Sequence, residues 1–148
     1  MVKDIPINEI ILRKYERPYN LEKRDLVKKI CLSLGLLQSG DSRDVIVDIL
    51  QVLIEERKNK NKLDSETIKS RVGELRKKHN LEIKGLAESN IRRQLKRLRD
   101  LMIIEKNNNL YHLSEFETLE KIFDDKIHKF IITPNVERIK EYLREVEK

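Results

Sequence analysis

The stretch that decides the fold is Ser89–Leu113, SNIRRQLKRLRDLMIIEKNNNLYHL. Its first half predicts an amphipathic helix over residues 89–100, because Ile91, Leu95 and Leu98 recur at the spacing of one helical face. Arginine, lysine and glutamine fill most of the remaining surface of that helix. The hydroxyl of Ser89 suits the N-cap, since it can accept a backbone N–H of the first turn. This half therefore predicts a short, strongly basic helix with one buried stripe.

The second half of the stretch predicts a β-hairpin. Two apolar runs, residues 102–105 and 110–113, have the length of short strands and flank the polar segment Lys106–Asn109. Asparagine tolerates the positive φ that tight hairpin turns need. A basic helix followed at once by a polar-tipped hairpin is the arrangement expected of a DNA-binding helix with a wing.

Positive charge is concentrated around this stretch. The 148 residues carry a formal net charge of +6, with 39% charged and 39% hydrophobic residues. From Arg57 to Lys106 there are 16 Lys or Arg residues against seven Asp or Glu residues, whereas the rest of the chain has 16 against 19. A basic surplus in one region favours a phosphate backbone as partner, because neutralising phosphates releases counterions. A solvated basic surface is the alternative.

The remaining composition bounds the class of protein. The chain is long enough for one domain with a hydrophobic core. A single cysteine, Cys31, rules out an intrachain disulfide and fits a reducing compartment. No apolar run approaches the roughly 20 residues that span a bilayer, and Met1–Ile10 is too charged for a signal peptide. We expect a cytoplasmic protein with no membrane partner.

Towards the N-terminus, apolar periodicity and breaker residues predict four helices. They are Ile7–Tyr15, a helix capped by Asn20 that ends at Leu34 before Gly35, Ser42–Arg57, and a helix that starts at Asp64 or Ser65 and ends near Lys78. The third is the most apolar, so we expect it at the centre of the core. The segments between them are a turn at Gln38–Asp41, a polar linker at Arg57–Lys62 and a connection at Leu81–Leu86.

Towards the C-terminus, two further helices are predicted. Ser114–Glu117 has the pattern of a capping box that opens the first, and Thr133-Pro134 opens the second. The second helix carries a narrow apolar stripe with spacings of three, four and three residues, formed by Val136, Ile139, Leu143 and Val146. Such a stripe suits one partner helix and predicts a homodimer. The alternative is that the stripe covers the core of the monomer.

The order of these elements and two short motifs carry a family resemblance. Gly85–Leu98, GLAESNIRRQLKRL, resembles the turn and recognition helix of many bacterial and archaeal regulators, and Leu101–Glu105 and Tyr111–Ser114 resemble the strands of a wing. Over residues 42–114 the chain is similar to winged helix-turn-helix transcription regulators. Gly35–Val47 and its flanking helices resemble small euryarchaeal regulators such as those that activate archaellum genes.

The resemblance implies a mainly α fold with a small β-hairpin wing: an N-terminal helical extension (1–40), a winged helix-turn-helix DNA-binding domain (41–114) and C-terminal helices (115–148). Two features depart from the family. Met102 stands where the family usually has glycine at the end of the helix, so Met102 is expected either in an αL-like conformation or in an altered turn. The connection before Ser89 is also longer than usual, which leaves the tilt of the helix undecided.

A helix in the major groove can distinguish every base pair by its pattern of donors and acceptors. With the apolar stripe inward, the opposite face presents the base-contacting candidates Asn90, Arg93, Gln94 and Arg97. Arginine can bind guanine O6 and N7, and asparagine or glutamine can bind adenine N6 and N7. Residues at the edges of this face or on the preceding helix are candidates for phosphate contact: Ser89, Arg92, Lys96, Arg99, Lys69, Arg71, Arg76, Lys77 and Lys78. An ordinary solvated helix face remains the alternative.

The wing supplies a second set of candidates: Lys106, Asn107, Asn108, Asn109 and His112. They would touch the minor groove or adjacent phosphates, and alternation along the second strand predicts that His112 points outward. A simple polar hairpin is the alternative.

The sequence does not indicate an enzyme. Its histidines are scattered, its one cysteine lies in an apolar helix, and it has neither zinc-ligand spacing nor a glycine-rich phosphate loop. We therefore expect no catalytic residue, no metal and no cofactor.

Two functions stay open from the sequence. The first is a sequence-specific regulator that binds double-stranded DNA at a promoter and blocks or recruits basal transcription factors. The second is a winged-helix protein-interaction module inside a transcription or replication assembly.

Overall fold

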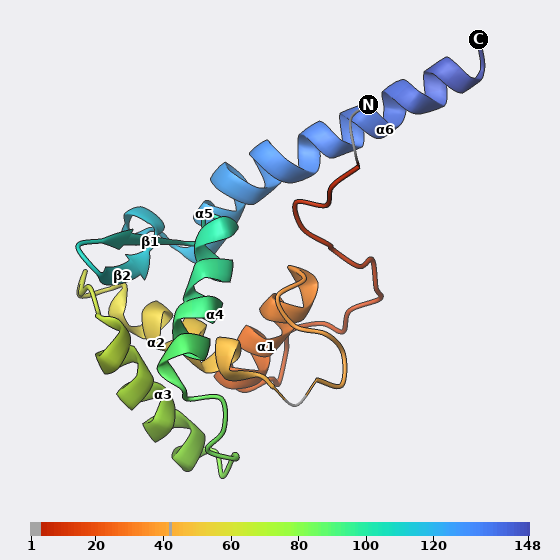
Figure 1. The fold of residues 1–148 in the computed structure, drawn as a ribbon. Helices are drawn as coiled ribbons and strands as arrows, with labels where there is room; N and C mark the ends of the chain where they lie inside the picture. Colours follow the sequence, from red (N-terminus) through yellow and green to blue (C-terminus); the bar gives the residue numbers. More distant parts are fainter. Residues whose placement is uncertain (1–3, 42) are drawn as a thin grey trace. The chain divides into compact units, whose positions relative to one another are not determined.

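The computed structural model of the protein describes residues 4–41 and 43–148. The fold is mainly helical with one two-stranded antiparallel hairpin (Figure 1). The elements are α1 (Lys23–Ser33), α2 (Val45–Glu56), α3 (Ser65–Lys78), α4 (Glu88–Asp100), β1 (Ile104–Asn107), β2 (Leu110–Leu113), a 3₁₀ turn (Ser114–Phe116), α5 (Leu119–Ile122), a π-helical segment (Phe123–Ile132) and α6 (Thr133–Val146).

The chain divides into two compact units that are not continuous in sequence. The first unit holds the described part of Met1–Val52 together with Ser65–Leu95, and the second holds Leu53–Asp64 with Lys96–Lys148. The boundaries fall inside α2 and α4, so each of these helices contributes residues to both units.

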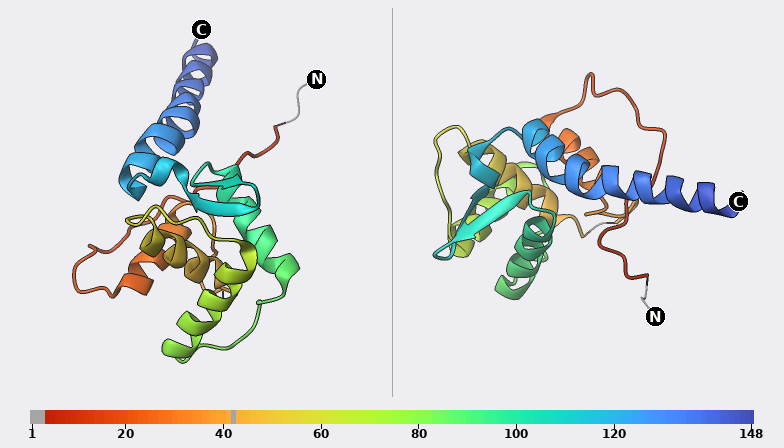
Figure 2. Two further views of the ribbon diagram at one scale, coloured as in Figure 1. Left: turned by 90° about the vertical axis from the view of Figure 1, so that its left-hand side faces the viewer. Right: turned by 90° about the horizontal axis from the view of Figure 1, so that it is seen from above.

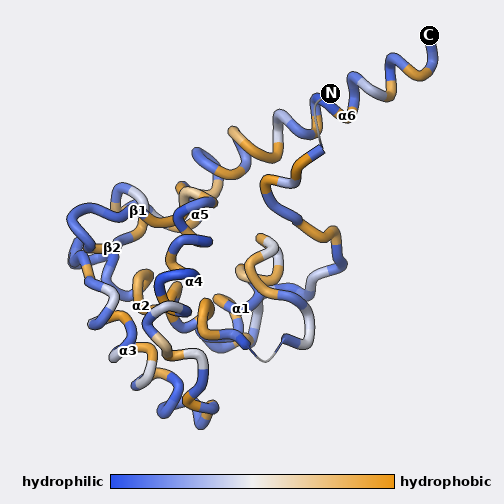
Figure 3. Tube along the Cα trace, viewed as in Figure 1, coloured by the Kyte–Doolittle hydropathy of each residue, from blue (hydrophilic) through white to orange (hydrophobic). Residues whose placement is uncertain are grey.

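Helix α2 is buried along most of its length, as its composition predicts. Ile49, Leu50 and Val52 are fully buried, and the helix is coloured as hydrophobic over most of its trace in Figure 3. Burying a side chain of this size contributes about 1.5–3 kcal/mol. The helix begins at Val45, and Ser42, the predicted start, lies outside the described residues.

The predicted helix at Ile7–Tyr15 does not form. Residues 8–17 are irregular, and Ile7, Ile11 and Leu12 are exposed, so no partner surface buries an apolar helical face. A helix of nine residues without such a partner is unstable in water. The segment is instead fastened by Asn8, whose side-chain amide donates to the carbonyl of Leu34 at 2.8 Å.

Helix α1 begins two residues later than the sequence indicates. Asn20 has a φ of +66° and is not the N-cap, which is Glu22. The predicted end at Gly35 is confirmed. Gly35 has a φ of +76°, and a Cβ there would overlap the carbonyl oxygen of Glu9, so any side chain would clash with the N-terminal segment.

The segment before α3 is more than the polar linker that the sequence predicts. Leu63 exchanges two backbone hydrogen bonds with Tyr111 of β2, at 3.0 Å and 2.7 Å. This isolated bridge adds one residue pair to the edge of the hairpin. Helix α3 itself has the predicted limits and buries Ile68 and Val72.

The hairpin turns over two residues. Asn107 pairs with Leu110, and the turn residues Asn108 and Asn109 have φ values of +51° and +62°. A two-residue turn with both φ values positive matches the twist of the flanking strands, and asparagine suits it. The first strand starts two residues later than predicted, because Met102 adopts the expected αL conformation (φ +63°) and ends the turn after α4.

The capping box predicted at Ser114–Glu117 is absent. The Ser114 hydroxyl donates to the carbonyl of Met102 at 2.6 Å, and Glu115 and Phe116 have positive φ. Thr118 is the N-cap instead, and its side chain accepts from the backbone N–H of Lys121.

A single helical run extends from Leu119 to Val146, rather than two helices. Phe123, Ile132 and Thr133 all have right-handed helical φ and ψ, so the predicted break at Thr133-Pro134 does not occur (Figure 2). Pro134 lies in the first turn of α6, directly after the π-helical segment.

Among the helices of the described residues, none has the length and apolarity to cross a membrane.

Candidate nucleic-acid interface

Helix α4 separates apolar from basic residues as its sequence predicts. Ile91, Leu95 and Leu98 have an exposed fraction of 0%, so the apolar stripe is completely buried. The exposed residues of the helix include five cations: Arg92, Arg93, Lys96, Arg97 and Arg99. The helix therefore presents a basic surface on a side that its own core packing leaves free.

Ser89 is exposed but is not the predicted N-cap. Helix α4 begins at Glu88, and Ala87 accepts hydrogen bonds from Asn90 and Ile91 through its carbonyl oxygen. The hydroxyl of Ser89 therefore lies within the first turn.

Three of the predicted base-contacting residues form one hydrogen-bonded group in the first unit. The side-chain oxygen of Asn90 accepts from the Arg93 guanidinium at 2.7 Å and from the Gln94 amide at 3.1 Å. The amide nitrogen of Asn90 donates to the carbonyl of Gly85 at 2.7 Å. Asn90 thus ties two neighbouring side chains to the turn that precedes the helix.

Gly85 is required at that turn for two reasons. Its φ is +78°, and a Cβ there would lie 2.9 Å from Cγ2 of Val45 in α2 and 3.3 Å from the amide nitrogen of Asn90. A larger residue would be strained in backbone conformation and would push the turn away from α2.

The other cations of α4 have weak partners. Arg92 pairs with Glu88 at 3.0 Å and Lys96 with Asp100 at 3.1 Å, both four residues apart on the exposed surface. Exposed pairs of this kind contribute little to stability. Both cations can therefore exchange their carboxylates for phosphate at small cost.

The remaining phosphate candidates divide between the units. Lys69 and Arg71 are half-buried on α3, and Lys77 and Lys78 are exposed there, in the unit that holds Asn90, Arg93 and Gln94. The prediction that Arg76 contacts phosphate is wrong, because its side chain is buried against Asp44 and Asp48. Lys96, Arg97 and Arg99 belong to the unit that holds the hairpin.

The tip of the hairpin is polar and exposed. Lys106, Asn107, Asn108 and Asn109 are all exposed, and the ammonium of Lys106 lies 5.7 Å from the ring centroid of Tyr111. This cation–π contact holds the lysine along the hairpin.

The expectation that His112 points outward is wrong. Its exposed fraction is 4%, its ring stacks on Phe116 at 4.3 Å, and its Nδ1 lies 2.8 Å from the carbonyl oxygen of Leu113. Its Nε2 is 3.6 Å from a carboxylate oxygen of Glu105, too far for a hydrogen bond. The 3₁₀ turn that follows β2 covers this side of the strand with Phe116, so alternation does not expose the residue.

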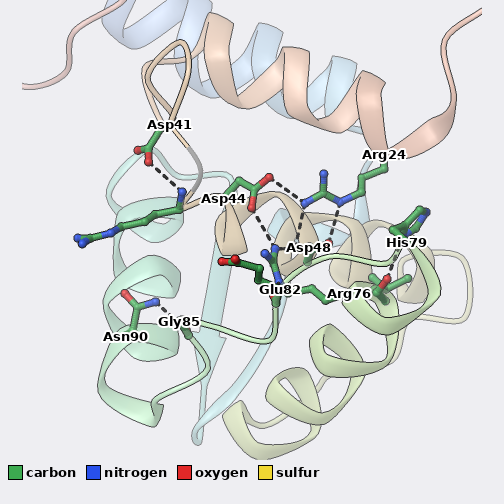
Figure 4. Close-up of polar contacts among 11 residues, drawn as sticks. Arg24, Asp41, Asp44, Asp48, Arg76, His79, Glu82, Gly85 and Asn90 are labelled. Carbon is green, nitrogen blue, oxygen red and sulfur yellow. Dashed lines mark hydrogen bonds and ion pairs between the residues drawn. The ribbon is translucent and has the colours of Figure 1, made fainter.

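The sequence interpretation missed a buried cluster of four charges in the first unit (Figure 4). Arg24 of α1 and Arg76 of α3 both bind Asp44 and Asp48, at 2.8–3.3 Å. All four residues are buried, and Asp48 is fully so. The sequence feature that could have revealed this cluster is the pair of carboxylates, Asp44 and Asp48, four residues apart at the start of the most apolar helix.

The cluster compensates its own desolvation. Burial alone would raise the pKa of Asp44, but hydrogen bonds and positive charge from Arg76 and Arg24 outweigh burial and hold this pKa below its ordinary value. Burial alone would lower the pKa of Arg24, and Asp48 and Asp44 raise it instead. Two arginines against two aspartates leave no net charge in the interior.

The apolar stripe near the C-terminus is exposed. The exposed fractions are 43% for Val136, 57% for Ile139, 60% for Leu143 and 79% for Val146, and α6 has no buried residue. The stripe therefore does not cover a monomer core. Figure 3 shows hydrophobic and hydrophilic colour alternating along this helix.

Within the part of the chain that the structure describes, no group of three or more His, Cys, Asp or Glu residues is placed to hold a metal ion. Comparison with family models, with curated proteins and with solved structures yields no match for this chain. Any function must therefore be argued from the geometry of the chain itself.

Proposed function

We propose that the protein is a sequence-specific transcription regulator of the winged helix-turn-helix class, which inserts α4 into the major groove of double-stranded DNA at a promoter. The observation that carries this proposal is the surface of α4, with five exposed cations outside a fully buried apolar stripe. An α-helix fits the major groove, and the phosphates on either side of the groove attract its positive charges.

Arg93 and Gln94 are the residues that we assign to base contact, and Arg97 is assigned with them one turn later. Arg93 and Gln94 lie next to each other near the start of the helix, where side chains reach deepest. Arg92, Lys96 and Arg99 are assigned to phosphates. Lys106 and the asparagines of the hairpin tip contact the DNA backbone beside the groove, while buried His112 takes no part.

The first experiment identifies the preferred duplex by selection from a random pool and then measures binding by mobility shift. Replacing Arg93 and Gln94 together by alanine should cost about 1–3 kcal/mol per lost bidentate contact. The control is Arg144→Ala, which removes an exposed arginine from α6. Equal affinity of the double variant and the wild type for the selected duplex would refute the base-contact assignment.

A protein-interaction module is the second candidate, and the exposed apolar residues of α6 and of residues 4–19 favour it. The two functions differ in their salt response. A regulator loses affinity steeply as salt rises and retains a preferred sequence, whereas a docking module binds DNA weakly and without preference.

The protein would act as a homodimer joined by the α6 stripe, work in the cytoplasm and contact basal transcription factors at the promoter. Exposure of all four stripe residues supports the dimer. Two copies would place two α4 helices on half-sites about one helical turn apart.

A further inference from the structure

Two side chains donate hydrogen bonds to the backbone of the connection between α3 and α4. Arg76 donates from Nε to the carbonyl oxygen of Glu82 at 2.7 Å, and Asn90 donates to the carbonyl oxygen of Gly85 at 2.7 Å. Between these anchors, Ile83 and Lys84 are exposed. The first anchor comes from the last turn of α3, and the second comes from the first turn of α4.

The first anchor belongs to the buried charge cluster. While Nε of Arg76 holds the turn, its Nη1 donates to Asp44 at 3.0 Å and to Asp48 at 2.8 Å (Figure 4). The planar guanidinium makes these bonds in fixed directions, so the two aspartates of α2 orient the group that holds Glu82. Arg24 binds the same two aspartates through three side-chain hydrogen bonds.

We infer that Arg76 is a positioning residue for DNA recognition: with the buried aspartates it fixes the turn at Glu82–Gly85 and thereby the orientation of the first turn of α4. The inference rests on the proposed function, because it assigns to this turn the placement of Arg93 and Gln94 relative to the bases. Arg76 itself is buried and contacts no DNA.

The chain offers a matched pair of variants. Arg76→Lys keeps the positive charge beside Asp44 and Asp48, but a single ammonium cannot also reach the carbonyl of Glu82 from the opposite side. Arg24→Lys makes the same substitution in the same cluster without touching the turn. Both variants should lose thermal stability. Any further difference between them reports the hydrogen bond from Arg76 to the carbonyl of Glu82, which only Arg76→Lys removes.

Amide hydrogen exchange of the full chain gives the readout that does not depend on DNA. The amides of Asn80 and Leu81, which donate to the carbonyls of Lys77 and Arg76, should exchange at least about tenfold faster in Arg76→Lys than in Arg24→Lys, because the bond that holds the turn onto α3 is lost only in the first. Equal exchange of this turn in the two variants would overturn the inference.

Mobility shift with the selected duplex and a scrambled duplex gives the second readout. Arg76→Lys should reduce the preference for the selected duplex about tenfold or more, while Arg24→Lys changes it less than about threefold. Loss of preference to the same extent in both variants would overturn the inference. If the wild type shows no preferred duplex, the proposed function fails, and hydrogen exchange still decides whether Arg76 holds the turn.

A second pair of variants moves the turn without touching the cluster, in case Arg76→Lys does not fold. Gly85→Ala places a Cβ 2.9 Å from Val45, whereas Gly40→Ala, at the same φ of +78°, meets none of the described residues within 4 Å. Loss of sequence preference in Gly85→Ala but not in Gly40→Ala supports control by the turn. Retained preference in a folded Gly85→Ala protein would overturn it.

Discussion

Asn90 illustrates how a residue's role depends on its neighbours. The spacing of α4 places it on the exposed face with Arg93 and Gln94. The structure adds that its oxygen binds both of these side chains and that its nitrogen binds Gly85. Asn90 is therefore better suited to orient Arg93 and Gln94 than to contact a base with its own amide.

The buried cluster leads to a prediction about acid stability. Because the pKa of Asp44 is lowered in the folded protein, its charged form contributes stability at neutral pH. That contribution is complete above the ordinary pKa of 3.8 and is lost as pH falls below it. Asp44→Asn should lower the free energy of unfolding at pH 7 and flatten its decline below about pH 4.

Urea unfolding between pH 3 and pH 7 measures this difference. Asp25→Asn removes an exposed carboxylate from α1 and serves as the control. An Asp44→Asn protein with the same acid profile as the wild type would mean that the cluster adds no pH-dependent stability.

At the scale of elements, the hairpin shows the closest agreement between local chemistry and structure. Its two turn residues are asparagines with positive φ, and the αL residue at the end of α4 is Met102, as its position predicts. The C-terminal elements agree less well. Ser114 binds Met102 across the hairpin rather than capping a helix, a contact between residues twelve apart that the capping-box pattern does not reveal.

The turn gives a prediction at this scale. Asn109→Ala should destabilise the protein by about 1 kcal/mol, because alanine avoids the left-handed region that asparagine tolerates. Asn107→Ala is the matched control, since Asn107 lies in β1 and is also exposed to solvent. Thermal unfolding of the two variants measures the difference, and equal midpoints would contradict a left-handed residue at position 109.

At the scale of the whole molecule, the question is which surface packs against the exposed apolar stripe of α6. Its stripe follows coiled-coil spacing, and neighbouring charges pair within the helix, as in Arg138–Glu141 and Lys140–Glu137. Such a helix carries little unbalanced charge against an identical copy. The prediction is that wild-type protein has the mass of a dimer.

Light scattering at working concentrations tests this prediction. Leu143→Lys places a charge in the stripe and should give the monomer mass, whereas Glu141→Lys changes charge outside the stripe and should leave the dimer intact. Because α6 has no buried residue, neither substitution should disturb a monomer core. A monomeric wild type would exclude the dimer.

The sequence by itself determined the helices α2, α3 and α4, the buried stripe of α4 and the chemistry of the hairpin turn. These features depend on periodicity and on backbone preferences within a few residues, which can be seen in the sequence. Tertiary structure alone decided the irregular course of residues 8–17, the burial of His112, and the burial and pairing of Asp44 and Asp48. The partners of those aspartates lie 20 to 32 residues away, and no local pattern specifies which distant arginine neutralises a buried carboxylate.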